Sequence, residues 1–292
     1  IRRNRPVSVM SFLNYQNLAL LLAAPLVSTD TRYIVNVRNH ISTSAKYGKS
    51  KWMRNVPRVM RRFFPRADLI LAPSRDVADD AREITGIAPE KFRVIYNPVF
   101  RQEIVELSRE TPSHPWLAGP DVPVVIAAGK LKPQKDFETL LRAFALVRRQ
   151  RAARLVILGR GPGKPALMDL AAQLGIGEDF QLPGHVKNPY AWFSNASVFV
   201  LSSAWEGLPN VLIEAMACGC PVISTDCPGG SSEILEDGRV GRLVPVGDAA
   251  AMAQAIADTL DSPPSREMLL ERAQAFSYDK AISGYEEVLT AS

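Results

Sequence analysis

Short apolar runs alternate along the chain with segments in which apolar residues recur at helical spacing. In the first third, runs rich in Val, Ile and Leu predict four buried strands, at residues 6–13, 31–37, 67–73 and 92–98. A helix that ends near Leu26 is predicted after the first strand. Ser74 and Gly86 bound another predicted helix, because Ser accepts bonds from free helix N–H groups and Gly adopts the left-handed conformation that ends helices. Strands that alternate with helices favour a parallel sheet and the α/β class.

The same alternation starts again after residues 97–122, where four prolines and a glycine indicate a linker between domains. Beyond the linker, further strands are predicted at 122–129, 153–159, 180–184, 198–203, 221–226 and 241–246. The predicted helices between and after them cover 136–150, 164–174, 188–195, 210–218, 231–237 and 248–260. This series is sufficient for a complete doubly wound domain. A last helix is predicted over 276–289.

Composition narrows the class of protein. Apolar residues make up 47% of the 292 residues, enough for real cores, and no apolar run reaches the roughly 18 residues of a membrane span. The cysteines are Cys218, Cys220 and Cys227, and three thiols so close together argue against a secreted disulfide framework. We expect them to be small core thiols of a cytoplasmic protein and not zinc ligands.

The net charge of +5 is unevenly spread. Residues 1–107 hold 18 Lys and Arg against 9 Asp and Glu, whereas the remainder holds 17 against 21. Much of the positive charge lies in residues 51–66, where arginines are interleaved with Trp and Phe. Such a helix can lie on an anionic membrane surface, or it can pack its aromatic side chains inward. We expect no nucleic-acid binding, because no known binding module is present.

The most distinctive stretch is WEGLPNVLIEAMACG, residues 205–219. Glu206 follows a predicted buried strand, Glu214 comes eight residues later, and Pro209 or Asn210 can begin a helix between them. Treated as helical spacing, eight residues place the two carboxylates about 12 Å apart on nearly the same face. This separation suits two hydroxyl-rich ends of one ligand, with a phosphate at the helix N-terminus. The alternative is two solvated charges on a surface helix.

This stretch resembles the E-x7-E motif of the retaining glycosyltransferases of family 4, of the type that builds bacterial surface glycans. Further segments that resemble family motifs follow in the expected order, at residues 127–141, 158–167, 182–203 and 224–235. The likeness is close over residues 92–288 and looser before them. It implies the GT-B fold, an α/β architecture of two Rossmann-like doubly wound parallel-sheet domains.

The resemblance also implies a division of labour between the domains. Residues 1–107 would form the acceptor-side domain, with residues 276–292 crossing back onto it, and residues 108–275 would bind the nucleotide-sugar. The N-terminal domain of the family has more than four strands, so we expect this one to be truncated. For these 292 residues, both sugar transfer and donor binding without transfer are therefore alternatives.

A sugar that leaves a nucleoside diphosphate leaves negative charge behind, so the site must supply positive charge. The resemblance implies that Lys130 and Lys135 do so, with Lys130 where the family usually has Arg. It assigns Glu206 to the donor sugar and to catalysis, and Glu214 to the ribose diol, because a carboxylate accepts two hydroxyl bonds. Solvated loop lysines are the alternative. Further substrate contacts implied by the motifs are Gly129, Gly159, Gly161, Gly184, His185, Val186, Gly207, Leu208, Pro209 and Asn210. The alternatives are a His185 side chain that only neighbours the base, and a plain strand-to-helix turn at Gly159 and Gly161.

His40 follows the strand predicted at 31–37 and would face the cleft, so it is a candidate for the sugar or phosphate, with a structural role as the alternative. The turn GRGPGK, residues 159–164, lacks the third glycine of a dinucleotide-binding motif and the spacing of a P-loop. The segment most similar to a dinucleotide-binding motif or a P-loop therefore matches neither, which argues against hydride transfer and ATP hydrolysis. No Asp-x-Asp triplet is present, and we expect neither a metal nor another cofactor.

The sequence thus predicts a retaining glycosyltransferase that moves a hexose or N-acetylhexosamine from a nucleotide-sugar, UDP-linked by preference, to a glycan or lipid-linked acceptor. We expect it in the cytoplasm or at the inner face of the cytoplasmic membrane. Two alternatives share the fold. A binding remnant would hold UDP without releasing sugar, and a nucleotide-sugar epimerase would isomerise the sugar without an acceptor.

Overall fold

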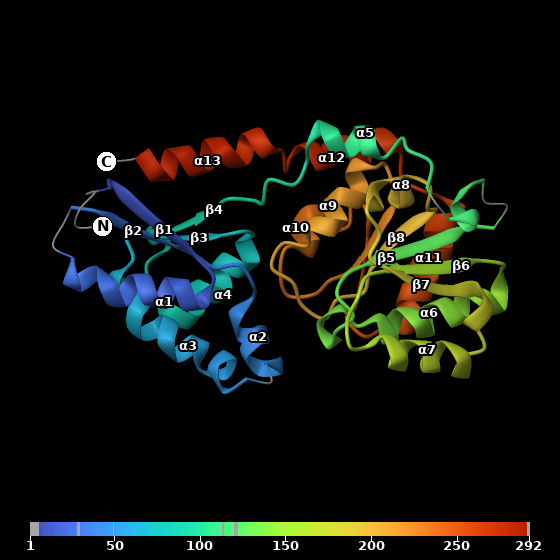
Figure 1. Cartoon of the computed structure of the whole chain (residues 1–292), viewed down its shortest axis with the longest axis horizontal. Coiled ribbons are helices and arrows are strands. Elements are labelled where there is room, and N and C mark those ends of the chain that lie inside the picture. Colours follow the sequence, from blue (N-terminus) through green and yellow to red (C-terminus); the bar gives the residue numbers. More distant parts are fainter. Residues whose placement is uncertain (1–5, 28–29, 49, 113, 120–121, 291–292) are drawn as a thin grey trace.

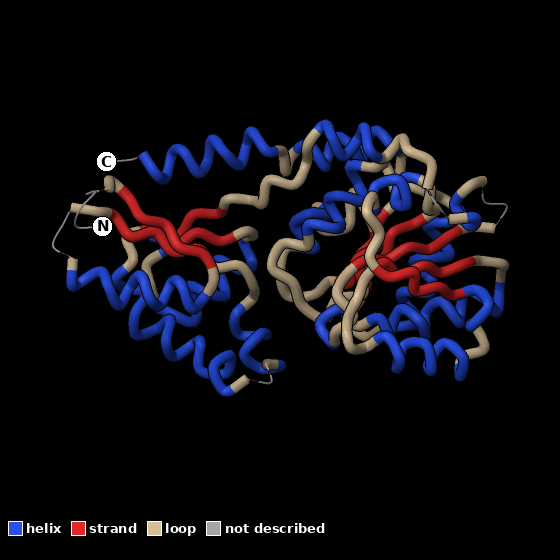
Figure 2. Tube along the Cα trace, in the orientation of Figure 1, coloured by secondary structure: helices blue, strands red, loops and turns tan. Residues whose placement is uncertain are grey.

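The chain folds into two α/β bodies, each built around its own parallel sheet (Figures 1 and 2). The computed structural model describes residues 6–27, 30–48, 50–112, 114–119 and 122–290. Every strand pair in both sheets is parallel among the described residues. The predicted α/β class with two sheets is therefore confirmed.

The N-terminal sheet has the strand order β1-β2-β3-β4. Its strands are β1 (Ser8–Phe12), β2 (Arg32–Asn36), β3 (Leu69–Ala72) and β4 (Phe92–Val94). The helices of this part of the chain are α1 (Asn14–Ala23), α2 (Ile41–Tyr47), α3 (Lys51–Phe63) and α4 (Arg75–Thr85). Alternate strand residues point to opposite faces, so Tyr33 and Val35 pack with α1, α3 and α4, while Ile34 faces the other side.

The C-terminal sheet has the strand order β10-β9-β8-β5-β6-β7. Its strands are β5 (Val124–Ala128), β6 (Arg154–Leu158), β7 (Phe180–Gly184), β8 (Val198–Leu201), β9 (Val222–Thr225) and β10 (Arg242–Val244). Its helices are α6 (Phe137–Gln150), α7 (Lys164–Gln173), α8 (Pro189–Ser194), α9 (Asn210–Ala217), α10 (Ser231–Leu235), α11 (Ala249–Asp261) and α12 (Arg266–Gln274). Because β6 and β8 flank β5, the connections run away from β5 in both directions, which creates a crevice at the strand ends.

The last helix, α13 (Tyr278–Thr290), returns to the N-terminal sheet (Figure 1). Its Ala281 and Val288 are buried against Ile34, Leu69 and Leu71, on the face opposite α1, α3 and α4. The returning segment runs beside the outgoing one, since Phe100 bridges to Ser277. Two stretches of chain therefore connect the bodies, and they lie side by side.

Among the residues that the structure describes, three α-helices lie outside the elements predicted from the sequence. They are α2, α12 and α5 (Gln102–Leu107), the last of which lies inside the predicted linker. Ile104 of α5 is fully buried in the core beside α8 and α9. The prolines around α5 indicated a linker, so the sequence prediction missed this buried residue. Proline and glycine indicate turns, but they do not indicate what a short helix between them packs against.

Helix α3 packs its apolar residues inward. Val56 and Met60 are buried in the N-terminal core, and Trp52 stacks on Tyr15 with ring centroids 4.4 Å apart. Arg61 and Arg66 donate to the Ile84 and Leu21 carbonyls. All the arginines of this segment are nevertheless exposed: Arg54, Arg58, Arg61, Arg62 and Arg66. The inward-packing interpretation of residues 51–66 is therefore correct, and the exposed face is a basic one. None of the helices described combines the length and the apolar character that crossing a membrane requires.

The three cysteines are free and buried. Burial raises the pKa of Cys218 to about 12 and of Cys227 to about 11, and it also raises the pKa of Cys220. Because the thiolate is the reactive form, we expect the native chain to react with a disulfide reagent at least about 100-fold more slowly than the denatured chain. A time course of thiol release before and after denaturation measures this, and native thiols that react at the denatured rate would contradict it.

Candidate functional site

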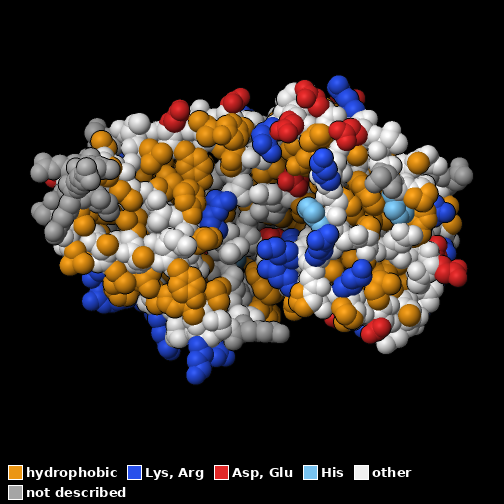
Figure 3. All heavy atoms as spheres, in the orientation of Figure 1, with side chains coloured by type: hydrophobic (Ala, Val, Ile, Leu, Met, Phe, Trp, Pro, Cys, Tyr) orange, Lys and Arg blue, Asp and Glu red, His pale blue; other side chains and the backbone are white. Residues whose placement is uncertain are grey.

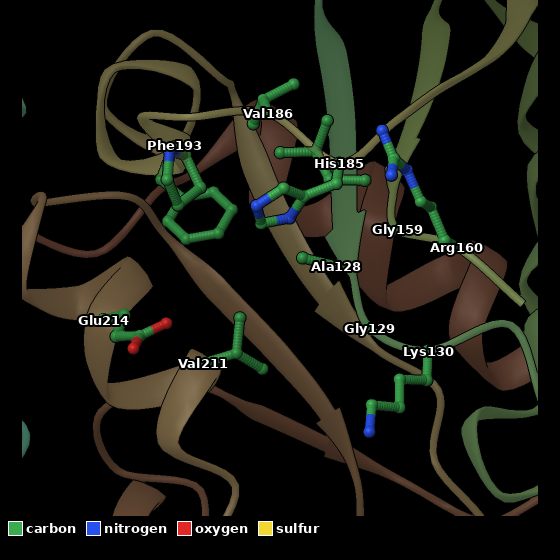
Figure 4. A pocket seen from close by; sticks show the side chains of 12 residues that line it. Ala128, Gly129, Lys130, Gly159, Arg160, His185, Val186, Phe193, Val211 and Glu214 are labelled. Atoms are coloured by element: carbon green, nitrogen blue, oxygen red, sulfur yellow. The ribbon is translucent and has the colours of Figure 1, made fainter.

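A cavity of about 400 Å³ opens at the carboxyl ends of the C-terminal strands, at the crevice beside β5. The residues around it come from the ends of β5, β6 and β7 and from helices α8 and α9 (Figure 4). They are Ala128, Gly129, Lys130, Leu158, Gly159, Arg160, His185, Val186, Pro189, Phe193, Val211 and Glu214. Six of them were singled out from the sequence, so motifs spread over 86 positions converge on one cavity.

Charges of opposite sign face each other in this cavity. Lys130 and Arg160 lie on one side, and Glu214 lies across from them (Figure 4). Val186, Phe193 and the side chain of Val211 form apolar wall between them. On the outer surface, Lys and Arg side chains gather around a histidine beside the junction of the two bodies (Figure 3). A ligand with anionic and hydroxyl-bearing parts and a flat apolar part matches this lining.

Glycines allow the strand ends to converge here. A Cβ on Gly159, whose φ is +150°, would lie 1.9 Å from the Gly129 carbonyl oxygen, so a side chain there is excluded. Gly161 likewise leaves no room, because a Cβ would lie 2.6 Å from the Leu131 oxygen. The N–H of Gly159 donates to the Gly184 carbonyl at 2.8 Å. These glycines shape the cavity floor, and Gly161 and Gly184 do so from outside its lining.

Glu214 lies on α9 and is partly buried. Its carboxylate makes no hydrogen bond or ion pair with the residues that the structure describes. Burial raises its pKa above the ordinary value, and the positive charge of Arg101 opposes this shift. A partly buried carboxylate without a partner, facing a cavity, is a candidate for contact with a ligand.

Glu206 lies in the loop after β8 and is buried, with a relative exposure of 7%. Its Oε1 atom accepts from Lys135 Nζ at 2.7 Å and from Ser203 Oγ at 2.6 Å. The Lys135 side chain runs past Gly129, where a Cβ would lie 2.9 Å from Lys135 Cε. The ion pair therefore adjoins the cavity through Gly129, although neither of its residues lines the cavity.

The helical geometry expected for the two glutamates is wrong. Helix α9 begins at Asn210, so Glu206 precedes it and only Glu214 is helical. The alternative of two solvated charges on a surface helix is also wrong, since Glu206 is buried and paired. Glu206 lies in the loop that connects the end of β8 to the start of α9, and this loop bends at residues 204, 207 and 208.

That loop contacts the N-terminal body. A Cβ on Gly207 would lie 2.1 Å from the Arg38 carbonyl oxygen, and the Asn210 side chain accepts from Asn97 Nδ2 at 2.6 Å. Leu208 is buried and Pro209 is the residue before α9. Gly207 and Asn210 therefore contribute to the junction, and none of the four residues 207–210 lines the cavity.

His40 also lies at the junction. Its backbone N–H donates to the Glu206 carbonyl at 3.3 Å, and its ring caps α2 through a contact with Thr43. Its Nε2 lies 3.5 Å from Asp76 Oδ2 and its Nδ1 lies 3.5 Å from Asp80 Oδ1. The side chain is thus engaged on the N-terminal side of the loop that carries Glu206.

Arg160 and Phe193 line the cavity and were not singled out from the sequence. Arg160 stands between Gly159 and Gly161, so its position in the glycine turn was the available signal. Phe193 belongs to an apolar run that also predicts core, and it is in fact 1% exposed. The sequence around Phe193 could not show whether its side chain lines a cavity or only packs in the core.

Comparison with known proteins gives consistent results. A family model described as glycosyl transferases group 1 matches residues 122–262, and one described as Glycosyltransferase Family 4 matches residues 1–102. An N-acetylgalactosaminyltransferase of Campylobacter jejuni, named for a diphospho-undecaprenol-linked acceptor, is 31% identical over 272 residues, covering 92% of this chain and 72% of the relative. An uncharacterized glycosyltransferase of Methanocaldococcus jannaschii is 31% identical over 80% of this chain and 59% of its own.

Solved structures share the fold. Sucrose-phosphate synthase of Thermosynechococcus elongatus superposes with a TM-score of 0.83 at 22% identity, covering 98% of this chain and 74% of that one. HepE of Anabaena, in complex with UDP, gives 0.79 at 20% identity, covering 97% and 79%. Likeness at this level of identity concerns the fold, and it confirms the predicted GT-B architecture.

The tight approach at Gly159 gives a testable consequence. We expect Gly159→Ala to lower the free energy of unfolding by at least about 2 kcal/mol, because it combines backbone strain with a clash against Gly129. Gly177→Ala is the matched control, since a Cβ there meets nothing within 4 Å. Denaturant titration of both variants measures this. Equal stabilities would show that the strand ends are not as close as described.

The raised pKa of Glu214 makes stability depend on pH. When the pKa of a carboxyl is higher in the folded than in the unfolded protein, the free energy of unfolding falls as the pH rises from the unfolded pKa to the folded pKa. We therefore expect Glu214→Gln to raise the melting midpoint at neutral pH, and this gain to vanish at acidic pH, where both side chains are neutral. The exposed Glu83→Gln is the control. Scanning calorimetry over a range of pH measures the melting midpoints of both variants. A higher midpoint of Glu214→Gln that persists at acidic pH would contradict the assignment of this effect to Glu214.

Proposed function

Because the chain belongs to the glycosyltransferases of family 4, we propose that it transfers a hexose or N-acetylhexosamine, with retention of configuration, from a UDP-sugar to a glycan or lipid-linked acceptor. The observation that carries this proposal is the cavity beside β5, where Lys130 and Arg160 face Glu214 next to the Lys135–Glu206 pair. The chain spans 72%, 59% and 66% of three curated relatives that it matches, so the activity of the whole protein is part of the proposal.

The proposed roles follow from charge and position. Lys130, Arg160 and Lys135 stabilise the negative charge that develops on the leaving diphosphate. The unpartnered carboxylate of Glu214 accepts from the two ribose hydroxyls, which suits a vicinal diol. Glu206 accepts from hydroxyls of the donor sugar. Since Glu206 Oε1 already accepts from Lys135, one arrangement positions both the acid for the sugar and the cation for the phosphate.

The choice of UDP and of the acceptor draws on the relatives. HepE of Anabaena was solved with UDP and with UDP-glucose, which supports a UDP-linked donor. The Campylobacter relative is named for a lipid-linked acceptor, and a relative from Rhizobium meliloti is named for lipopolysaccharide core biosynthesis. We propose an acceptor of this surface-glycan class. The exposed arginines of α3 support its encounter at an anionic membrane surface, on the cytoplasmic side.

We propose that the reaction needs no metal ion. Support comes from Lys130 and Arg160, which line the cavity, and from Lys135, which adjoins it, because these side chains supply the charge that a divalent cation would otherwise bring to the diphosphate. His185 and Val186 lie at the rim where the base would rest, with Phe193 as an apolar wall. In this arrangement the base is held by shape and backbone, and the His185 ring is a neighbour of the base.

Removing the assigned charges tests the proposal. We expect Lys135→Ala and Glu206→Ala to lower sugar transfer by about 10²–10³-fold, because each removes a group aimed at the transition state. Lys130→Ala should act similarly and does not break a buried pair, whereas the exposed Lys132→Ala is the control from the same loop. A screen of UDP-sugars by mass spectrometry, with and without chelator, measures transfer.

Several outcomes separate the alternatives. Wild-type rates in both Lys135→Ala and Glu206→Ala would overturn the proposal. Melting curves of both variants establish that a lowered rate does not come from loss of the fold. UDP that binds in calorimetry without sugar release would indicate the binding remnant. An isomerised sugar formed without acceptor would indicate the epimerase, and a rate lost on chelation would overturn metal independence.

A further inference from the structure

Two aromatic rings meet across the junction outside the donor cavity. Tyr47, the last residue of α2, stacks on Trp205, with ring centroids 5.0 Å apart and planes inclined by 11°. Trp205 belongs to the C-terminal body and directly precedes Glu206 in the chain. The side chain of Tyr47 remains 54% exposed. The contact therefore joins the bodies but leaves much of its ring surface open.

Hydrogen bonds fix the backbone at Trp205 and at the start of α2, the helix that ends at Tyr47. The Trp205 carbonyl accepts from Gln134 Nε2 at 2.9 Å, and the N–H of Ala204 donates to the Gln134 carbonyl at 2.8 Å. The start of α2 is fixed because Asp80 accepts from the N–H groups of Ile41 and Ser42. The backbone that carries Trp205 and the first turn of α2 are therefore fixed, and Tyr47 lies at the other end of that helix.

The position of the pair indicates which substrate it meets. Neither ring lines the donor cavity, yet Trp205 is one residue from the carboxylate assigned to the donor sugar. The donor is bounded by the C-terminal body, so the molecule that approaches from the N-terminal side is the second substrate. Lys46 Nζ lies 5.3 Å from the Tyr47 ring centre, which adds a cation beside the rings.

The chemistry of the rings indicates the part of the acceptor that binds. A sugar ring has an apolar face of C–H groups and a rim of hydroxyls, and Tyr and Trp offer a rigid apolar face with a polar tip. Such rings give contact area at low cost in side-chain entropy. We propose that Tyr47 and Trp205 form the subsite for the acceptor sugar ring, with Lys46 beside it. This inference rests on the proposed function and specifies a saccharide at the accepting end.

Binding of simple saccharides tests the subsite without turnover. The probes are the methyl α-glycosides of glucose, galactose, N-acetylglucosamine and N-acetylgalactosamine, followed by saturation-transfer difference NMR with and without UDP. We expect a signal from at least one glycoside in the wild-type chain and in Tyr47→Phe, which keeps the ring. The signal should be lost in Tyr47→Ala and kept in Tyr278→Ala, whose ring is 49% exposed and distant in the sequence.

Two results would overturn the subsite. One is a glycoside signal that survives in Tyr47→Ala, and the other is the absence of any signal from the wild-type chain, with or without UDP. Where transfer occurs, Tyr47→Ala should also raise the KM for the glycoside acceptor by about tenfold, while the KM for the donor and the acceptor-independent release of UDP stay unchanged.

The two proposals can fail separately. If no UDP-sugar is turned over but the glycoside signals depend on Tyr47, the proposed transfer is wrong and the saccharide subsite stands. If transfer proceeds and Tyr47→Ala leaves the KM for the acceptor unchanged, the subsite is wrong and the proposed transfer stands.

Discussion

The ion pair between Lys135 and Glu206 is the interaction on which the site depends. Both side chains are largely buried, with 16% and 10% of their surface exposed, and a buried charge is tolerated only when it is paired and hydrogen-bonded. Ser203 supplies the second bond to the same oxygen. The backbone of Glu206 extends the network, because its N–H donates to Pro228 and its carbonyl accepts from His40. One carboxylate residue thereby connects loops after β5, β8 and β9 with the N-terminal body.

Small residues and polar bonds complete this junction. Gly207 lets the Arg38 backbone approach closely, and the N–H of Gly229 donates to Asp76 at 2.7 Å. On the other side, Glu233 accepts from Tyr96 Oη at 2.6 Å, and burial together with this carboxylate raises the pKa of Tyr96 to about 12. Glu233 also pairs with Arg75 of α4. The junction is therefore polar at many points, as expected for bodies that associate within one chain and can part.

The sequence predicts the fold well where a local pattern determines it. Apolar runs located all ten strands of the described residues, and the predicted turn after β6 is present at Gly159, where the structure adds a close approach to Gly129. Prediction failed where the conformation depends on a residue far away in the sequence. The helix begins at Asn210, as predicted, but helical spacing was also applied to Glu206, which lies in the loop before that helix and pairs with a residue 71 positions away. Helix α5 was missed for the same reason, since Ile104 is buried by helices far along the chain. Arg160 was missed because a side chain between two glycines carries no periodic signal.

The paired crossings of the chain have a mechanical consequence. The outgoing and returning stretches are bonded together, with the N–H groups of Val99 and Phe100 both donating to the Phe276 carbonyl. Two connections that adjoin each other act as a single pivot, so relative motion reduces to swinging about that line, with sliding suppressed. In Figure 1 the pivot lies at the top of the molecule and α2 at the bottom. The displacement of a swinging body grows with distance from its axis, so a rotation of a few degrees at Phe276 moves Tyr47 relative to Trp205 more than it moves residues beside the pivot.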